Sequence, residues 1–227
     1  MAGTKDKADK AVATPVPVVE VSHEEKFVAW IRANQKPLGI GLGAVVVVIL
    51  ATWFMSTAAK RKENFARTQL EQAWNAEDAG NAPLAAGELQ RVVQTYGGTP
   101  AAFEARLSLN QNRLMNGQSQ LAADDLTQFL GTNPPAEIGM QANQLLGGAL
   151  ENLGKAGEAG AAYEKAVGLA SMDFQKAELL LAAARAYRTA GETEKASAAL
   201  KTIVDKYPES AAYPAAEIRL GELLKGS

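Results

Sequence analysis

Few residues of this chain have the types and spacing that catalysis requires. His23 is the only histidine and has no serine–acid partner in view, so neither a catalytic triad nor a histidine metal site is predicted. Glu24-Glu25 and Asp124-Asp125 are neighbours rather than i,i+4 partners, and we expect solvated helix faces rather than an acid/base pair. The sequence therefore predicts no enzyme, no metal site and no cofactor.

The composition excludes further classes of function. The chain has no cysteine, so disulfides and thiolate metal sites are excluded. The formal net charge of −2 provides no strong positive field, and we predict no nucleic-acid partner. Gly39, Gly41 and Gly43 do not form a nucleotide-binding loop, because no strand precedes them and they lie in an apolar run.

An uncharged run over residues 37–59 predicts a single transmembrane helix. As a helix it would reach about 34 Å, enough for the roughly 30 Å hydrocarbon core of a bilayer. Trp30 and Trp53 lie near its two ends and are expected at the membrane interface. Gly39 and Gly43 form a G-x-x-x-G pair that would let another membrane helix pack closely, although such pairs also arise by chance. A cleaved signal peptide is the alternative, which the long preceding segment disfavours.

Two segments precede this run. Residues 1–21 are rich in Lys, Ala, Pro and Val without a helical period, which predicts a disordered tail or an arm that becomes ordered on a partner. Residues 22–36 are predicted to form an interfacial helix, since Ser22 and Glu25 fit a capping box and basic residues flank the apolar ones. Pro37 is expected to redirect the chain.

The basic residues predict an orientation. Six Lys and Arg residues precede the apolar run, and four follow it closely, three of them at 60–62. The positive-inside rule favours a cytoplasmic N-terminus, although the cluster at 60–62 opposes it. The helix is expected to run on, or nearly so, into the domain that follows.

The rest of the chain carries a four-fold repeat with a spacing of 37 residues. Glycines mark it at Gly80, Gly117, Gly154 and Gly191. An alanine follows five residues after each glycine, at Ala85, Ala122, Ala159 and Ala196. Since periods of this size are typical of stacked helical units, the sequence predicts a solenoid whose surface binds partners.

Each unit is expected to be a helix–turn–helix pair. In residues 140–170, Gly154 would end the first helix, while Gly147 and Ala159 are small enough for the two helices to touch. One pair cannot bury its apolar face alone, so the units must stack. The predicted fold is all-α: one transmembrane helix, then a solenoid over 60–225 of about four pairs with a capping helix at Tyr213–Leu224.

The order of residues in these units resembles the tetratricopeptide repeat. In the last unit it comprises Ala184, Tyr187, Gly191, Ala196, Leu200, Ile203 and Pro208. The usual period is about 34 residues, and the longer period here resembles the repeats of bacterial envelope proteins. Two units depart from the pattern, one with Gly97-Gly98 and the other with Ser171 where proline is expected.

The layout of a short tail, one membrane helix and a carboxy-terminal repeat domain resembles the ancillary subunit of the bacterial SecYEG translocon. That resemblance implies an inner-membrane anchor, a periplasmic repeat domain, and contact with the translocon and periplasmic chaperones or nascent chains. It is architectural and assigns no functional residue.

The inner surface of the solenoid is the candidate partner-binding site. Register places the following residues on or near it: Trp74, Glu77, Gln111, Gln144, Glu151, Arg185 and Arg188. Amide, acidic and arginine groups of this kind could hold an extended peptide or a partner helix, although each residue could equally be ordinary solvated surface. Trp74 is either an interface anchor or packing between the membrane helix and the first unit.

Two other functions remain open at this stage. The chain could be a structural accessory subunit of a large respiratory or photosynthetic membrane complex, a role that the Gly39/Gly43 pair and an ordered tail would serve. It could also be a scaffold for envelope assembly. Neither the partner nor the oligomeric state follows from the sequence.

Overall fold

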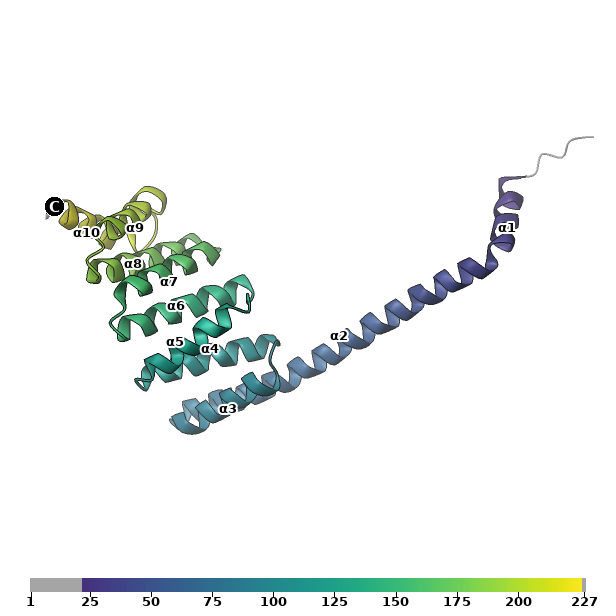
Figure 1. Cartoon of the computed structure of the whole chain (residues 1–227), viewed down its shortest axis with the longest axis horizontal. Helices are drawn as coiled ribbons and strands as arrows, with labels where there is room; N and C mark the ends of the chain where they lie inside the picture. Colours follow the sequence, from purple (N-terminus) through teal and green to yellow (C-terminus); the bar gives the residue numbers. More distant parts are fainter. Residues whose placement is uncertain (1–21, 226–227) are drawn as a thin grey trace, which may run out of the picture. The chain divides into compact units, whose positions relative to one another are not determined.

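The computed structural model describes residues 22–225, and every regular element within them is a helix (Figure 1). The tail predicted for residues 1–21 lies outside the described residues. The chain divides into two compact units after Ser56. We describe each unit by itself.

The first unit contains α1 (His23–Ala33) and the first part of α2 (Gln35–Asp78). The predicted capping box is confirmed. The Ser22 hydroxyl accepts a hydrogen bond from the backbone N–H of Glu25 at 3.3 Å, and the Glu25 carboxylate accepts one from the backbone N–H of Ser22 at 3.2 Å. Phe27 and Trp30 stack on the exposed surface of α1, with ring centroids 6.5 Å apart.

The interruption between α1 and α2 lies at Asn34, not at Pro37 as the sequence suggested. Pro37 is the third residue of α2. Proline is tolerated there, because the N–H groups of the first helical turn have no partner within the helix. The chain therefore changes direction before the apolar run begins.

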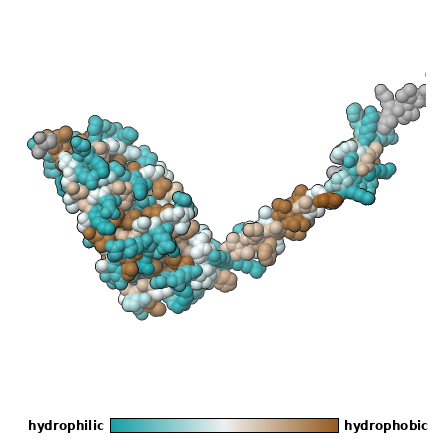
Figure 2. Space-filling view, in the orientation of Figure 1, coloured by the Kyte–Doolittle hydropathy of each residue, from teal (hydrophilic) through white to brown (hydrophobic). Residues whose placement is uncertain are grey.

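α2 is long and apolar enough to cross a membrane, as judged by its length and composition. None of its most apolar 18-residue stretch is buried inside the structure. Figure 2 shows hydrophobic side chains gathered on the part of α2 next to α1. An exposed apolar stretch of this length has the dimensions of the hydrocarbon core of a bilayer.

The second unit contains the remainder of α2 and all later helices. These are α3 (Ala82–Thr95), α4 (Pro100–Met115), α5 (Ser119–Leu130), α6 (Ala136–Asn152), α7 (Ala156–Leu169), α8 (Asp173–Thr189), α9 (Thr193–Lys206) and α10 (Tyr213–Lys225). We call α2, α4, α6, α8 and α10 the A helices, and α3, α5, α7 and α9 the B helices. Four A–B pairs stack in order and α10 follows as a single helix (Figure 1), so the predicted solenoid is confirmed.

The turn inside each pair depends on the repeat glycine. Gly80, Gly117, Gly154 and Gly191 have φ angles of 74°, 72°, 73° and 76°. A residue with a Cβ pays a steric penalty in this left-handed region, whereas glycine does not. The glycine lets the chain leave the A helix and enter the B helix within a few residues, which keeps the two helices in contact.

Two tyrosines set the spacing between neighbouring helices in the third and fourth pairs. Tyr163 of α7 packs against Gly147 of α6, and Tyr187 of α8 packs against Gly160 of α7. A Cβ at either glycine would lie within 2.6 Å of a tyrosine ring atom. The predicted small residue at Gly147 is therefore explained by the ring that lies on it.

Candidate functional site

Polar side-chain contacts join α2 to α4, α6 to α8 and α8 to α10, and residues on this A-helix face form the candidate site. Arg67 of α2 contacts Glu104 of α4, 37 residues along. Glu151 of α6 contacts Arg185 of α8, 34 residues along. These separations approximate one repeat, because stacking places each A helix beside the next one.

The strongest of these contacts centres on Glu151. Arg185 donates to the Glu151 carboxylate through Nε at 3.2 Å and through Nη2 at 3.0 Å, and the Tyr163 hydroxyl donates to the same carboxylate at 2.9 Å. The hydrogen bond to Glu151 raises the pKa of Arg185. Glu151 is thus shared by a B helix of its own pair and the A helix of the next.

The ends of the face show the same arrangement. Trp74 donates from Nε1 to the Ser108 hydroxyl at 3.4 Å and packs against the apolar core of the first two pairs. It is half-buried, and this packing is one of the two roles that the sequence suggested for Trp74. At the other end, Arg188 lies 3.9 Å from the Glu222 carboxylate of α10.

Three of the predicted residues have no side-chain partner in the part of the chain that is described. Gln111 and Gln144 are exposed on α4 and α6, and Glu77 is half-buried near the end of α2. Unpaired amides on neighbouring A helices can hydrogen-bond an incoming backbone at no internal cost. The structure therefore divides the predicted set into residues that join repeats and residues that have no side-chain partner among residues 22–225; binding of a partner by either group stays a prediction.

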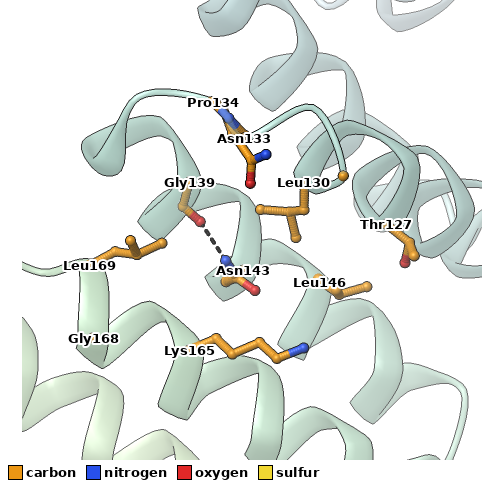
Figure 3. A pocket seen from close by; sticks show the side chains of 11 residues that line it. Thr127, Leu130, Asn133, Pro134, Gly139, Asn143, Leu146, Lys165, Gly168 and Leu169 are labelled. Atoms are coloured by element: carbon orange, nitrogen blue, oxygen red, sulfur yellow. Dashed lines mark hydrogen bonds between the residues drawn. The ribbon is translucent and has the colours of Figure 1, made fainter.

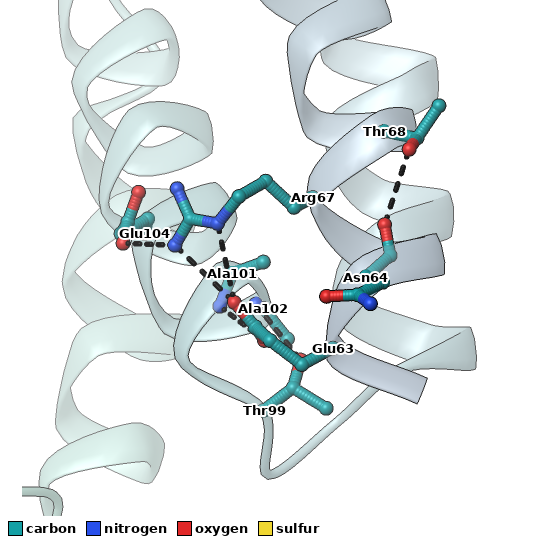
Figure 4. A network of polar contacts seen from close by, with 8 residues as sticks. All are labelled: Glu63, Asn64, Arg67, Thr68, Thr99, Ala101, Ala102 and Glu104. Atoms are coloured by element: carbon teal, nitrogen blue, oxygen red, sulfur yellow. Dashed lines mark hydrogen bonds and ion pairs between the residues drawn. The ribbon is translucent and has the colours of Figure 1, made fainter. Parts of the chain in front are cut away.

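Sequence reasoning missed a polar network at the start of the solenoid (Figure 4). The Glu63 carboxylate accepts from the backbone N–H of Ala101 at 3.1 Å and from Arg67 at 3.2 Å. Arg67 also donates to Glu104 at 3.1 Å, which raises the pKa of Arg67. Glu63 therefore caps the N-terminus of α4 from α2, where a negative charge is favourable. The 37-residue separation of Arg67 and Glu104 was the available signal.

The prediction of a solvated face for Asp124-Asp125 is wrong for Asp125. The Asn110 side chain, fully buried, donates to the Asp125 carboxylate at 2.7 Å and accepts from Arg113 at 3.0 Å. Arg106 lies 3.9 Å from the same carboxylate. Asp125 thus joins α4 to α5 inside the second pair, whereas Asp124 remains exposed and accepts from Gln120 at 2.8 Å.

Burial raises the pKa of Tyr163 and of Tyr187 above the ordinary value of 10.0, and a hydrogen bond to Glu151 or Glu164 adds to the shift. The fold therefore holds the neutral phenol. A pKa raised in the folded state contributes stability that is fully present below about pH 10 and is lost as pH rises toward the folded pKa.

We expect the midpoint of chemical denaturation to fall as the pH rises above about 10, where unfolded tyrosine ionises. The double variant Y163F/Y187F should show a flatter fall over the same range. Denaturation of both proteins, followed by circular dichroism at several pH values, measures the difference. Parallel pH profiles would show that neither phenol is coupled to folding.

The residues predicted for the membrane are exposed within the first unit. Trp30 and Trp53 are 54% and 65% exposed. A Cβ added at Gly39 or Gly43 would meet nothing within 4 Å, so this face of α2 is open to another helix. Among residues 22–225, no group of acidic or histidine side chains is arranged to hold a metal ion.

Comparison with known proteins identifies the class of this repeat. Residues 141–171 and 178–210 match family models of the tetratricopeptide repeat. They correspond to the third and fourth pairs, in which the expected small and aromatic residues occur. No curated protein matches the sequence. The chain therefore contains tetratricopeptide repeats, which generally bind protein partners and generally act as non-enzymatic scaffolds.

Solved structures agree on the fold. A tetratricopeptide repeat protein from Parabacteroides merdae superposes with a TM-score of 0.57 at 14% identity, covering 71% of this chain and 60% of that one. Repeats of a putative kinesin light chain from Podosopora anserina give 0.56 at 21% identity, covering 70% and 84%. The MamA protein gives 0.53 at 18% identity, covering 70% and 86%. At these identities the likeness establishes the fold alone.

Proposed function

We propose that this chain is a membrane-anchored scaffold, an ancillary subunit of the bacterial inner-membrane translocon that recruits periplasmic chaperones or nascent chains. α2 is the anchor, the N-terminus is cytoplasmic and the solenoid is periplasmic. The partner binds the A-helix face. No residue performs chemistry.

The observation that carries this proposal is the composition of α2. Its apolar stretch is unburied and ends at the basic cluster 60–62, immediately before the residues that cap α4. A helix of this kind matches the thickness of a bilayer, and the exposed side chains of α1 suit its interface. The translocon assignment itself rests on the resemblance of the whole layout.

The A-helix face supports the choice of partner. Charged side chains on it are largely neutralised by one another across repeats, as in the Glu151–Arg185 pair. The exposed amides of Gln111 and Gln144 remain available. A surface of this kind favours an uncharged extended segment, whose backbone groups pair with amides, over a highly charged ligand.

Purification of the tagged full chain in a gentle detergent, with partners identified by mass spectrometry, tests the proposal. Stoichiometric translocon subunits and periplasmic chaperones would support it. Stoichiometric recovery with electron-transfer or pigment-bearing subunits would overturn it in favour of a structural role in that complex. Recovery with peptidoglycan or outer-membrane assembly factors would favour an envelope scaffold.

The double substitution Q111R/Q144R should reduce recovery of the partner about tenfold or more, because two unpaired charges would have to be buried under it. The matched control is Q90R/Q128R, which places the same residues at exposed positions of the B helices α3 and α5. Equal recovery with both variants would contradict binding at the A-helix face. Circular dichroism should show both variants folded.

Orientation can be tested with a single introduced thiol, since the chain has no cysteine. Ser171 is exposed between α7 and α8, so S171C should react with a membrane-impermeant maleimide from the periplasmic side of intact inner membranes. Reaction only after lysis would place the repeats in the cytoplasm and contradict the proposed orientation.

A further inference from the structure

A cavity of about 660 Å³ opens on the B-helix side of the solenoid, between α5, α6 and α7. Its walls are largely apolar and include Leu130, Pro134, Leu146 and Leu169 (Figure 3). Asn133 in the same wall has a φ of 52°, in the left-handed region. The A-helix face does not include this cavity.

One buried polar group of this cavity has an unused acceptor. Asn143 is only 5% exposed, and its Nδ2 donates to the Gly139 carbonyl at 2.8 Å. A carbonyl can only accept, so this contact fixes the orientation of the amide and turns Oδ1 away from Gly139 (Figure 3). No group in the described residues donates to Oδ1. Oδ1 is not among the fully buried polar atoms that lack a partner, so it stays open to the cavity, where the N–H or O–H group of a ligand can donate to it.

The preceding repeat shows what occupies the equivalent place. A smaller cavity of about 360 Å³ lies there, lined by Phe103, Arg106 and Phe129 among others. The two rings lie 5.8 Å apart, and the Arg106 guanidinium lies 5.0 Å from the centre of the Phe129 ring. Thus the second pair fills this site with its own aromatic rings and a cation.

The third pair has lost those groups. One period of 37 residues later, Phe103, Arg106 and Phe129 become Met140, Asn143 and Ala166. The ring and the guanidinium are absent, and a larger cavity lined by Asn143 lies there. Neither Met140 nor Ala166 lines the larger cavity, so its wall contains no aromatic ring, in contrast to the wall of the smaller one.

A charge at the rim adds a second requirement. Lys165 of α7 lines the cavity, runs along its edge below Asn143, and has no acidic partner within the described residues (Figure 3). Lys165 is exposed, and a carboxylate next to a group bound in the cavity would pair with its ammonium. Asn143 Oδ1 and Lys165 thus offer a bound group one hydrogen-bond acceptor and one positive charge.

We propose that this cavity binds an aromatic side chain with a hydrogen-bond donor, tryptophan or tyrosine, from a partner protein in which an acidic residue is adjacent. The ring occupies the place that Phe129 fills one repeat earlier, its N–H or O–H donates to Asn143 Oδ1, and the carboxylate pairs with Lys165. This site is separate from the A-helix face and does not depend on the translocon assignment.

The capped dipeptide acetyl-Trp-Glu-amide is the probe, added to the full chain in mild detergent with isotope-labelled leucine methyl groups. We expect saturable shifts of the Leu130, Leu146 and Leu169 methyl resonances at about millimolar concentrations of the dipeptide. The affinity should be this low because a dipeptide has few atoms with which to contact the cavity. Acetyl-Phe-Glu-amide, which lacks the donor, should bind about three- to tenfold more weakly.

Three variants test each part of the site. N143L introduces the residue found one repeat later, Leu180, and should abolish the preference for tryptophan over phenylalanine. K165E should favour acetyl-Trp-Lys-amide over acetyl-Trp-Glu-amide. A166F should fill the cavity as Phe129 does and prevent binding of every probe. If A166F fails to fold, N143L and K165E still decide the matter.

Several results would overturn the proposal. These are the absence of saturable shifts, equal binding of the tryptophan and phenylalanine probes to the native chain, or an unchanged preference in N143L. Free indole that binds far more tightly than the dipeptide would indicate a small-molecule site. Concentration-dependent shifts of the same methyl groups without any probe would show that a second copy of the chain occupies the cavity.

Discussion

Replacement of Tyr187 by alanine should lower the free energy of unfolding of the repeat unit by about 3–5 kcal/mol, the cost of removing a large buried aromatic ring. Tyr187 is 1% exposed and fills the space over Gly160 between α7 and α8. Its ring also lies 5.1 Å from the Lys195 ammonium. Loss of the ring leaves a cavity where two helices meet, and chemical denaturation of the full chain measures the effect.

The control is Y187F, which keeps the ring and removes only the hydroxyl. That hydroxyl donates to the Glu164 carboxylate at 2.7 Å, a contact with an exposed acidic residue. We expect Y187F to cost about 0.5–1.5 kcal/mol, the usual net value of a hydrogen bond. If Y187A were no more harmful than Y187F, the ring would not be holding the two helices apart.

The second large effect is expected from the residue beneath the ring. In G160A the new Cβ would lie 2.5 Å from Cε1 of Tyr187, closer than two carbon atoms can approach. Alanine gains up to about 1 kcal/mol of intrinsic helix stability over glycine, while overpacking of a core costs about 1–3 kcal/mol. The cost of overpacking should exceed the gain in helix stability, so G160A should lower the free energy of unfolding by about 1–2 kcal/mol, as measured by chemical denaturation.

A matched control lies in the same helix. A Cβ at Gly168 of α7 meets nothing within 4 Å, so G168A should be neutral or stabilising by up to about 1 kcal/mol. The double variant G160A/Y187A adds a further check. With the ring removed, the alanine should no longer destabilise the chain, so additive effects of the two substitutions would contradict a direct contact.

The repeat and its turns were accessible from the sequence. Gly154 and Gly191 stand one period apart because a left-handed φ is needed at the same point of each pair, and glycine adopts it without strain. The alternation of apolar segments with these glycines predicted the helices. The apolar segment after Pro208 predicted a final single helix, which is α10. Each of these features depends on residues that are close together in the sequence.

The candidate site was only partly accessible. Periodicity placed Gln111, Gln144 and Glu151 on the A helices, but it could not tell which of them would bond across repeats. Glu151 reaches Arg185 because stacking brings positions 34 residues apart together, while the repeat itself has a period of 37. The stagger between neighbouring helices decides such pairs, and it depends on how side chains pack.

What the sequence determined by itself is the order of elements: an apolar helix of membrane length, four helical pairs and a final helix. Only the tertiary structure decided which polar groups are buried and what faces them. Asp125 became part of a partly buried network and Asn143 a buried side chain in the wall of a cavity, although both are ordinary polar residues on helices in the sequence. Burial and hydrogen bonding are set by neighbours distant in the chain, and no local pattern records those neighbours.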